Sequence, residues 1–299
     1  MIKLTFSDNI EKFLSNNENF EVLEDILDKT AQEYFNLEKS KDTFYPGKKI
    51  NPGLFEEMVP PIVKETNDFL GAYNIKLPIF AFFHVPTAMK RCSYFGLGIF
   101  AMSTLLTSLG GSVFGGMSFS AIIGAFATLG MYGRAAKQLK WTRYYSQEPD
   151  MHLITLNEKW TVPAVGDLAH EYDHHMVNKS TNLFNYLPNP IIEGHARGVE
   201  GKICKAFSEK FDNPAFEYNY AHRIASEIND AYHIICEKKN IYPMESLKNL
   251  KIPPVHGYGD IHGSYHYKIG SAAMHVAERR YDDKVYKDVL KSDFWFLRA

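Results

Sequence analysis

One stretch of this chain restricts its possible folds more than any other, because residues 92–133 contain no charged side chain. Within it, the subsegments 93–109 and 113–131 each approach the roughly 17 to 25 residues that a helix needs to cross a bilayer. Gly110 and Gly111 lie between them. The pattern predicts an apolar helical hairpin, either inserted in a membrane or buried in the core of a soluble protein.

Two further features favour the membrane alternative. Small residues recur every four positions along the second subsegment, where another helix could approach closely; they are Gly116, Ser120, Gly124 and Thr128. Basic residues flank the run on both sides, and basic flanks stay in the cytoplasm; they are Lys90, Arg91, Arg134, Lys137, Lys140 and Arg143. We therefore expect transmembrane helices and a lipid bilayer partner through residues 92–133. The rest of the chain should face the cytoplasm, or be cytoplasmic if the hairpin is buried.

The overall charge balance gives little sign of a nucleic-acid partner. Lys and Arg number 33 against 35 Asp and Glu, for a net charge of -2. The basic residues that cluster are those beside the apolar run. We expect no nucleic acid among the partners.

The segment TVPAVGDLAHEYDHHMVN predicts a helix that carries a metal site. His170 and His174 are four residues apart, so their imidazoles project from one face and can take two positions of a tetrahedral metal. Glu171 sits beside them, where its carboxylate can take a proton from a water that attacks a carbonyl. A loop then leads to a second helix, IIEGHARGVEGKICKAF, with Glu193 in its first turn.

This arrangement resembles the gluzincin metallopeptidases, which have an HExxH helix and, some 20 residues later, a glutamate on a second helix. Glu193, Gly194, His195 and Glu200 are similar to the Glu-Gly-His and trailing Glu of aminopeptidases of the leukotriene A4 hydrolase kind. The resemblance implies one Zn²⁺ per chain, held by His170, His174 and Glu193. It makes Glu200 an acceptor that orients a ligand histidine. His195 could line the pocket.

The resemblance also bears on the substrate. The strand MHLITLN precedes the metal helix as the edge strand does in gluzincins, where it binds an extended substrate, so a peptide or protein substrate is implied. The Gly-x-Met-Glu-Asn segment that those aminopeptidases use for the substrate amine is missing. Aminopeptidase specificity is therefore not expected.

A glycine-punctuated cluster of tyrosines and histidines follows at PPVHGYGDIHGSYHYKIG. Zinc peptidases commonly use a Tyr or His donor to stabilise the oxyanion of the reaction. Tyr267 and Gly270 are similar to the Tyr-x-x-Gly element of gluzincin-like families. We favour Tyr267 for this role, with Tyr265 and His262 as alternatives. Aromatic packing at the start of a helix is the alternative explanation for any one of them, but the cluster as a whole favours a functional role.

The expected fold is α+β and mostly helical: a zincin-like catalytic domain with a small antiparallel sheet and an inserted apolar helical hairpin. IKLPIFAFF at residues 75–83 suits a strand, and QLKWTRYY, the turn SQEPD and MHLITLN suit a hairpin. The expected regions are a helical N-terminal part with the first strand at 1–90, the hairpin at 91–134 and the metallopeptidase domain at 135–299.

The predicted function is that of a membrane-associated zinc endopeptidase. Two alternatives are a soluble cytosolic gluzincin and a membrane-anchored interaction protein whose zinc only joins two helices. A carboxylate-bridged di-iron bundle is a third, since Glu171 and His174 form a Glu-x-x-His pair and Asp230 and His233 a weaker one.

Overall fold

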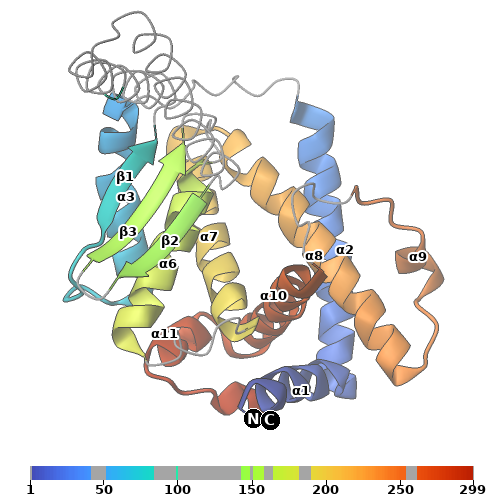
Figure 1. Cartoon of the computed structure of the whole chain (residues 1–299). Helices are drawn as coiled ribbons and strands as arrows, with labels where there is room; N and C mark the ends of the chain where they lie inside the picture. Colours follow the sequence, from blue (N-terminus) through green and yellow to red (C-terminus); the bar gives the residue numbers. More distant parts are fainter. Residues whose placement is uncertain are drawn as a thin grey trace, which may run out of the picture.

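The computed structural model describes residues 2–41, 52–83, 99, 143–148, 151–157, 164–181, 190–253 and 261–298. Figure 1 shows a small sheet at one side of the molecule and a group of long helices beside it. The elements are α1 (Ile2–Ser15), α2 (Asn17–Ser40), α3 (Pro52–Leu70), β1 (Ile79–Phe83), β2 (Arg143–Glu148), β3 (Met151–Asn157), α6 (Ala164–Ser180), α7 (Pro190–Phe211), α8 (Ala215–Lys239), α9 (Glu245–Lys248), α10 (Ile261–Tyr281), α11 (Lys284–Leu290) and the 3-10 helix η3 (Trp295–Arg298).

The expectation of an α+β fold with a small antiparallel sheet was wrong. The described chain is built mainly of helices, and its strands have the order β1-β3-β2 in a mixed arrangement. β2 pairs with β3 antiparallel, but β1 pairs with β3 parallel, with Ile79 opposite Leu153. Parallel neighbours need a long crossover between them, and residues 84–142 provide the length. The local turn signal at 146–150 carried no information about this distant pairing.

The strand order also contradicts the expectation that MHLITLN is an edge strand that could bind an extended substrate. β3, the strand MHLITLN, lies between β1 and β2, so its backbone is paired on both sides. A peptide cannot add to a strand whose two edges are already occupied. Within the described sheet, the outer strands are β1 and β2.

The expectation of a transmembrane helix is corrected as well. Among the described residues, no helix combines the length and the apolar character needed to span a membrane. The long helix α2 illustrates why: Leu23 and Leu27 are buried, whereas Asp25 and Lys29 on the opposite side are exposed and form an ion pair. The predicted hairpin at 91–134 lies outside the described residues, apart from Ile99.

One hydrophobic core joins the N-terminal helices to the C-terminal ones. Phe13 of α1 meets Phe296 of η3 edge-on at 6.3 Å between ring centroids, and Phe20 of α2 stacks on Tyr232 of α8 at 5.5 Å. The same cluster includes apolar residues of α6, α7 and α10. Burial of each such side chain contributes about 1.5–3 kcal/mol. Helices from both ends of the chain therefore support the helices that carry the candidate site.

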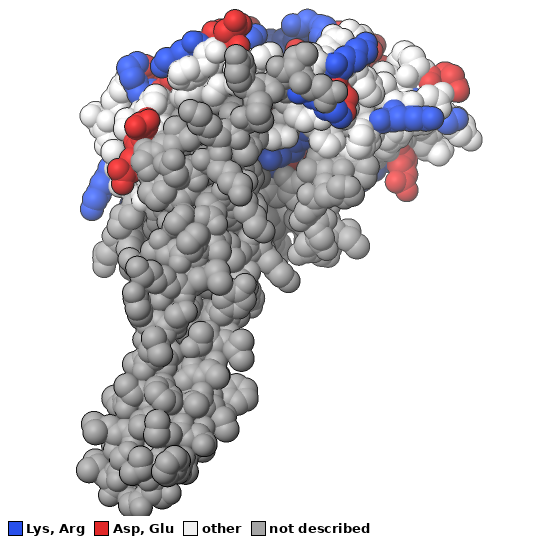
Figure 2. All heavy atoms as spheres, turned by 90° about the horizontal axis from the view of Figure 1, so that it is seen from above, with Lys and Arg blue, Asp and Glu red and all other residues white. Residues whose placement is uncertain are grey.

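Acidic and basic side chains are mixed over the described part of the face seen in Figure 2. This agrees with the nearly balanced composition of the whole chain. In that view, the described surface has no extended patch of one sign.

Candidate metal centre

Helix α6, which carries His170 and His174, is buried along most of its length. Every residue from Val165 to Val177 is buried, including the polar ones. His170 is 0% and His174 7% exposed, and their rings meet edge-on with centroids 4.6 Å apart. Because buried polar groups are costly unless they find partners, two histidines one helical turn apart in a core indicate a shared ligand or charge.

Glu193, in the first turn of α7, completes a compact group with these histidines. Its Oε2 atom lies 3.5 Å from His170 Nε2 and 3.5 Å from His174 Nε2. One ligand atom from each of the three residues lies within 4.8 Å of the others. Zinc ligands at about 2.0–2.1 Å in a tetrahedral arrangement are roughly 3.4 Å apart, so both carboxylate separations suit a zinc ion.

The charge state of Glu193 also suits a cation. Burial would raise the pKa of this carboxyl, but the neighbouring His174 and His170 outweigh burial and hold the pKa well below its usual value. Its Oε2 atom is buried and accepts no hydrogen bond from the described residues. An ionised oxygen in that position needs a positive partner, which protonated imidazoles or a metal ion can supply.

Glu171 lies next to His170 on α6 and is 6% exposed. Burial lowers the pKa of the His174 imidazole, but the carboxylates of Glu193, Glu171 and Asp173 together outweigh burial and raise it. Glu171 therefore acts electrostatically on His174, one of the candidate ligands.

Glu200 contacts the side of His170 that faces away from Glu193. Its Oε2 atom lies 3.2 Å from His170 Nδ1. Burial would raise the pKa of Glu200, but Arg223 and Arg197 outweigh it and keep the pKa well below the usual value. An ionised acceptor at Nδ1 favours the imidazole tautomer that presents a lone pair at Nε2, as a metal ligand requires.

Sequence reasoning predicted Glu200 but missed its partners Arg197 and Arg223, and it also missed Glu227, the other carboxylate that binds Arg197. Arg197 is fully buried and donates to both Glu200 and Glu227. The available signal was the spacing on α7: Glu193, Arg197 and Glu200 are four and three residues apart, so they share one helix face. A single arginine between small residues on such a face indicates a buried ion pair.

The predicted oxyanion donors lie at the start of α10. The Tyr267 ring is 6.3 Å from the His170 ring at an interplanar angle of 23°. Tyr265 packs against the hydrophobic core and contacts His266. His262 belongs to the first turn of α10, and its side chain lies outside the described part. Of the described candidates, Tyr267 is the one that the structure brings beside a predicted ligand.

Tyr267 lies close to α6 and α7 because α7 and α10 cross with their backbones in contact. A Cβ atom at Gly194 would lie 2.0 Å from the carbonyl oxygen of Gly270, and a Cβ at Gly270 would lie 1.9 Å from Pro190 O. Only glycine allows so close a crossing. Gly270 is one turn after Tyr267, and Gly194 directly follows Glu193.

His195 has both ring nitrogens engaged away from the three predicted ligands. Its Nδ1 lies 2.7 Å from Asp173 Oδ2 and its Nε2 lies 2.9 Å from the backbone oxygen of Tyr286. These contacts tie α7 to α6 and α11. The structure therefore places His195 as a buried link between helices, and not at the lining of the centre.

Two other features lie apart from this centre. Asp230, which a di-iron site would need, forms an ion pair with Lys268 at 2.9 Å.

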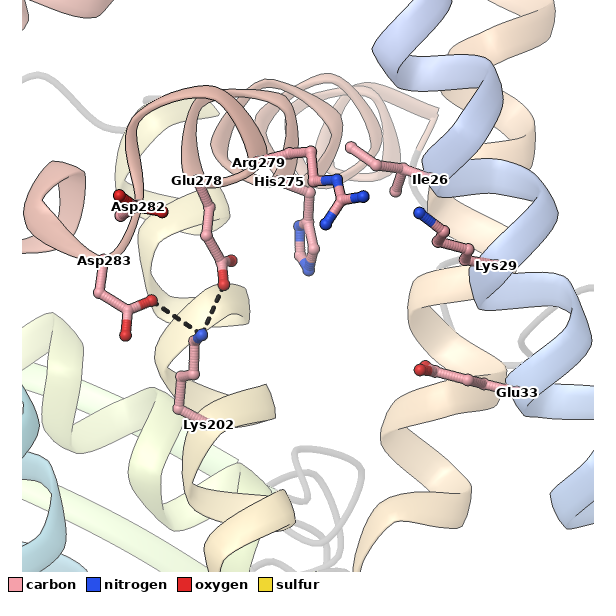
Figure 3. A pocket seen from close by; sticks show the side chains of 9 residues that line it. All are labelled: Ile26, Lys29, Glu33, Lys202, His275, Glu278, Arg279, Asp282 and Asp283. Atoms are coloured by element: carbon pink, nitrogen blue, oxygen red, sulfur yellow. Dashed lines mark ion pairs between the residues drawn. The ribbon is translucent and has the colours of Figure 1, made fainter.

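A cleft of about 520 Å³ lies between α2, α7 and α10 (Figure 3). In it Lys202 bridges Glu278 at 2.5 Å and Asp283 at 2.8 Å. The cleft is lined by none of the three predicted metal ligands.

No family model, curated protein or solved structure matches this chain.

Proposed function

We propose that this chain is a zinc-dependent endopeptidase with Glu171 as its general base. The observation that carries the proposal is the convergence of His170, His174 and Glu193, with Glu193 Oε2 3.5 Å from each imidazole Nε2. Two imidazoles and one carboxylate form a ligand set of catalytic zinc sites, which keep a further position for water or substrate.

A zinc ion held by His170, His174 and Glu193 would polarise the scissile carbonyl and lower the pKa of a bound water. Glu171 takes the proton of the attacking water as the new carbon–oxygen bond forms. The same carboxyl then gives that proton to the leaving amine as the carbon–nitrogen bond breaks. The Tyr267 hydroxyl donates a hydrogen bond to the oxyanion.

Glu171, which is next to the candidate ligand His170, favours a catalytic zinc site over a zinc site that only joins helices. A structural site has no need of a carboxylate at position 171, whereas a hydrolase needs a base there. The buried position of Glu171 beside His170 supports the catalytic proposal. The proposed substrate is a peptide or protein.

The test begins with zinc content and zinc affinity of the purified chain. We expect about one zinc per chain, and its loss in His170→Ala, His174→Ala and Glu193→Ala, because each removes one of three ligands. His175→Gln is the matched control. His175 lies on the same helix, and its Nε2 contacts Lys76 O at 2.6 Å, a bond that the glutamine amide can retain. Full zinc retention in the three ligand variants would refute the proposal.

The second part of the test separates catalysis from metal binding. Glu171→Gln should keep the zinc and lower hydrolysis of a protein substrate such as casein by about a hundredfold or more, because an amide cannot accept the proton. Wild-type activity in this variant would rule out Glu171 as the base.

A further inference from the structure

Among the described residues, Arg197 on α7 has the largest side chain that is fully buried. Moving a guanidinium out of water costs several kcal/mol unless carboxylates and hydrogen bonds compensate it. Arg197 follows Glu193 by one helical turn and precedes Glu200 by one turn. All three side chains therefore leave the same face of α7, toward α6 and α10.

Two carboxylates hold the guanidinium from different sides. Its Nε donates to both oxygens of Glu227, at 3.1 and 3.2 Å, and one terminal nitrogen donates to Glu200 Oε2 at 2.6 Å. Glu227 in turn accepts a hydrogen bond from Ser271 at 2.5 Å. The planar fork of an arginine fixes orientation as well as charge, so these contacts define where the guanidinium plane lies.

The guanidinium contacts two parts of the candidate centre, the Tyr267 ring and the pair formed by Glu200 and His170. The guanidinium carbon lies 4.9 Å from the centroid of the Tyr267 ring, within the range of a cation–π contact. The nitrogen that binds Glu200 Oε2 lies 3.4 Å from His170 Nδ1. Glu200 Oε2 itself is closer to Nδ1, at 3.2 Å, and unlike the guanidinium it can accept the Nδ1 proton. Arg197 thus contacts both Glu200, the hydrogen-bond acceptor of His170, and the ring of Tyr267.

We propose that Arg197 is a positioning residue of the metal centre, which holds Glu200 against His170 and Tyr267 beside it. The inference rests on the proposed zinc site. It adds that the affinity of the site for metal, and the place of the tyrosine, depend on a side chain that is not itself a ligand. Groups that orient a ligand histidine in this way typically change metal affinity about 10–100-fold.

The test uses Arg197→Met, which removes the charge, and Arg197→Lys, which keeps the charge but loses the planar fork. Tyr232→Phe on α8 is the control, since it removes the hydrogen bonds of a buried hydroxyl to Glu24 and to the backbone N–H of Met244, which take no part in the Arg197 network. Zinc affinity is measured by competition with a chromogenic chelator, folding by circular dichroism, and ligand geometry by the visible spectrum of the Co²⁺-substituted protein.

We expect Arg197→Met to lower zinc affinity about 10–100-fold, Arg197→Lys to lower it less, and both to alter the Co²⁺ spectrum. Tyr232→Phe should leave affinity and spectrum unchanged, whatever it does to stability. If Arg197→Met does not fold, the affinity and spectrum of Arg197→Lys decide the question.

The two possible failures are distinguishable. Wild-type protein that binds no zinc would refute the zinc site and, with it, the role of Arg197. Tight zinc binding by wild type, with equal affinity and an identical Co²⁺ spectrum in the folded Arg197 variants, would refute the role of Arg197 alone. An equal loss in Tyr232→Phe would do the same, because the effect would then belong to the general stability of the fold.

Discussion

The backbone contact between α7 and α10 makes a sharp prediction for Gly270→Ala. The new Cβ would lie 1.9 Å from Pro190 O, whereas ordinary contacts begin at 3.4 Å. The difference, 3.4 minus 1.9, means that the helices must separate locally by about 1.5 Å. Neither partner is a side chain that could turn away, so the change has to be absorbed by the two helices themselves.

The net cost follows from two opposed contributions. Overpacking costs about 1–3 kcal/mol, and a backbone-to-backbone clash belongs at the upper end. Alanine in a helix interior recovers roughly 0.5–1 kcal/mol relative to glycine. We therefore expect Gly270→Ala to lower the free energy of unfolding by about 2 kcal/mol, roughly a factor of 30 in the folding equilibrium.

The same displacement should reach the metal centre. Pro190 and Glu193 share the first turn of α7, and metal ligands tolerate shifts of only about 0.2 Å. Zinc affinity should therefore fall about tenfold or more. Gly201→Ala is the matched control on α7, because its Cβ would meet the Tyr220 side chain at 2.3 Å, and a ring can move.

The assays are urea unfolding of both variants and zinc competition on the folded proteins. Gly201→Ala should cost less stability than Gly270→Ala and leave zinc affinity unchanged. Gly270→Ala with wild-type stability would refute the close crossing, and equal zinc loss in both variants would refute the link to Glu193.

Two further predictions concern catalysis and pH. Tyr267→Phe should lower turnover about a hundredfold at unchanged zinc affinity, because the oxyanion loses a donor, whereas Tyr265→Phe should change it little; equal losses in steady-state kinetics would count against Tyr267. Burial would raise the pKa of Glu278, but His275 and Lys202 outweigh burial and lower it from 4.5. Its ionised form therefore stabilises the fold above pH 4.5, and this contribution is lost as the pH falls below that value. Glu278→Gln should be less stable than wild type at neutral pH, with the gap closing on acidification; a gap independent of pH in urea unfolding would contradict the assignment.

Some expectations failed because the relevant partner was remote in sequence. The antiparallel sheet was wrong since β1 pairs with β3 across residues 84–142, a choice that no local pattern encodes. His195 shows a different error. It follows Glu193 by two positions, about 200° around a helix, so it could not face the same way. Helical geometry alone would have placed it against another element.

The sequence by itself determined the local parts of the candidate site. The spacing of His170 and His174 puts both imidazoles on one helix face, and Glu193 falls in the first turn of the next helix, because helical periodicity depends on neighbouring residues alone. The tertiary structure decided how these parts meet. The separation of 3.5 Å between Glu193 Oε2 and each imidazole depends on how α6 and α7 are set against each other. The burial of Arg197 and the crossing at Gly270 likewise depend on packing between elements, and packing is set by many side chains that are distant along the chain.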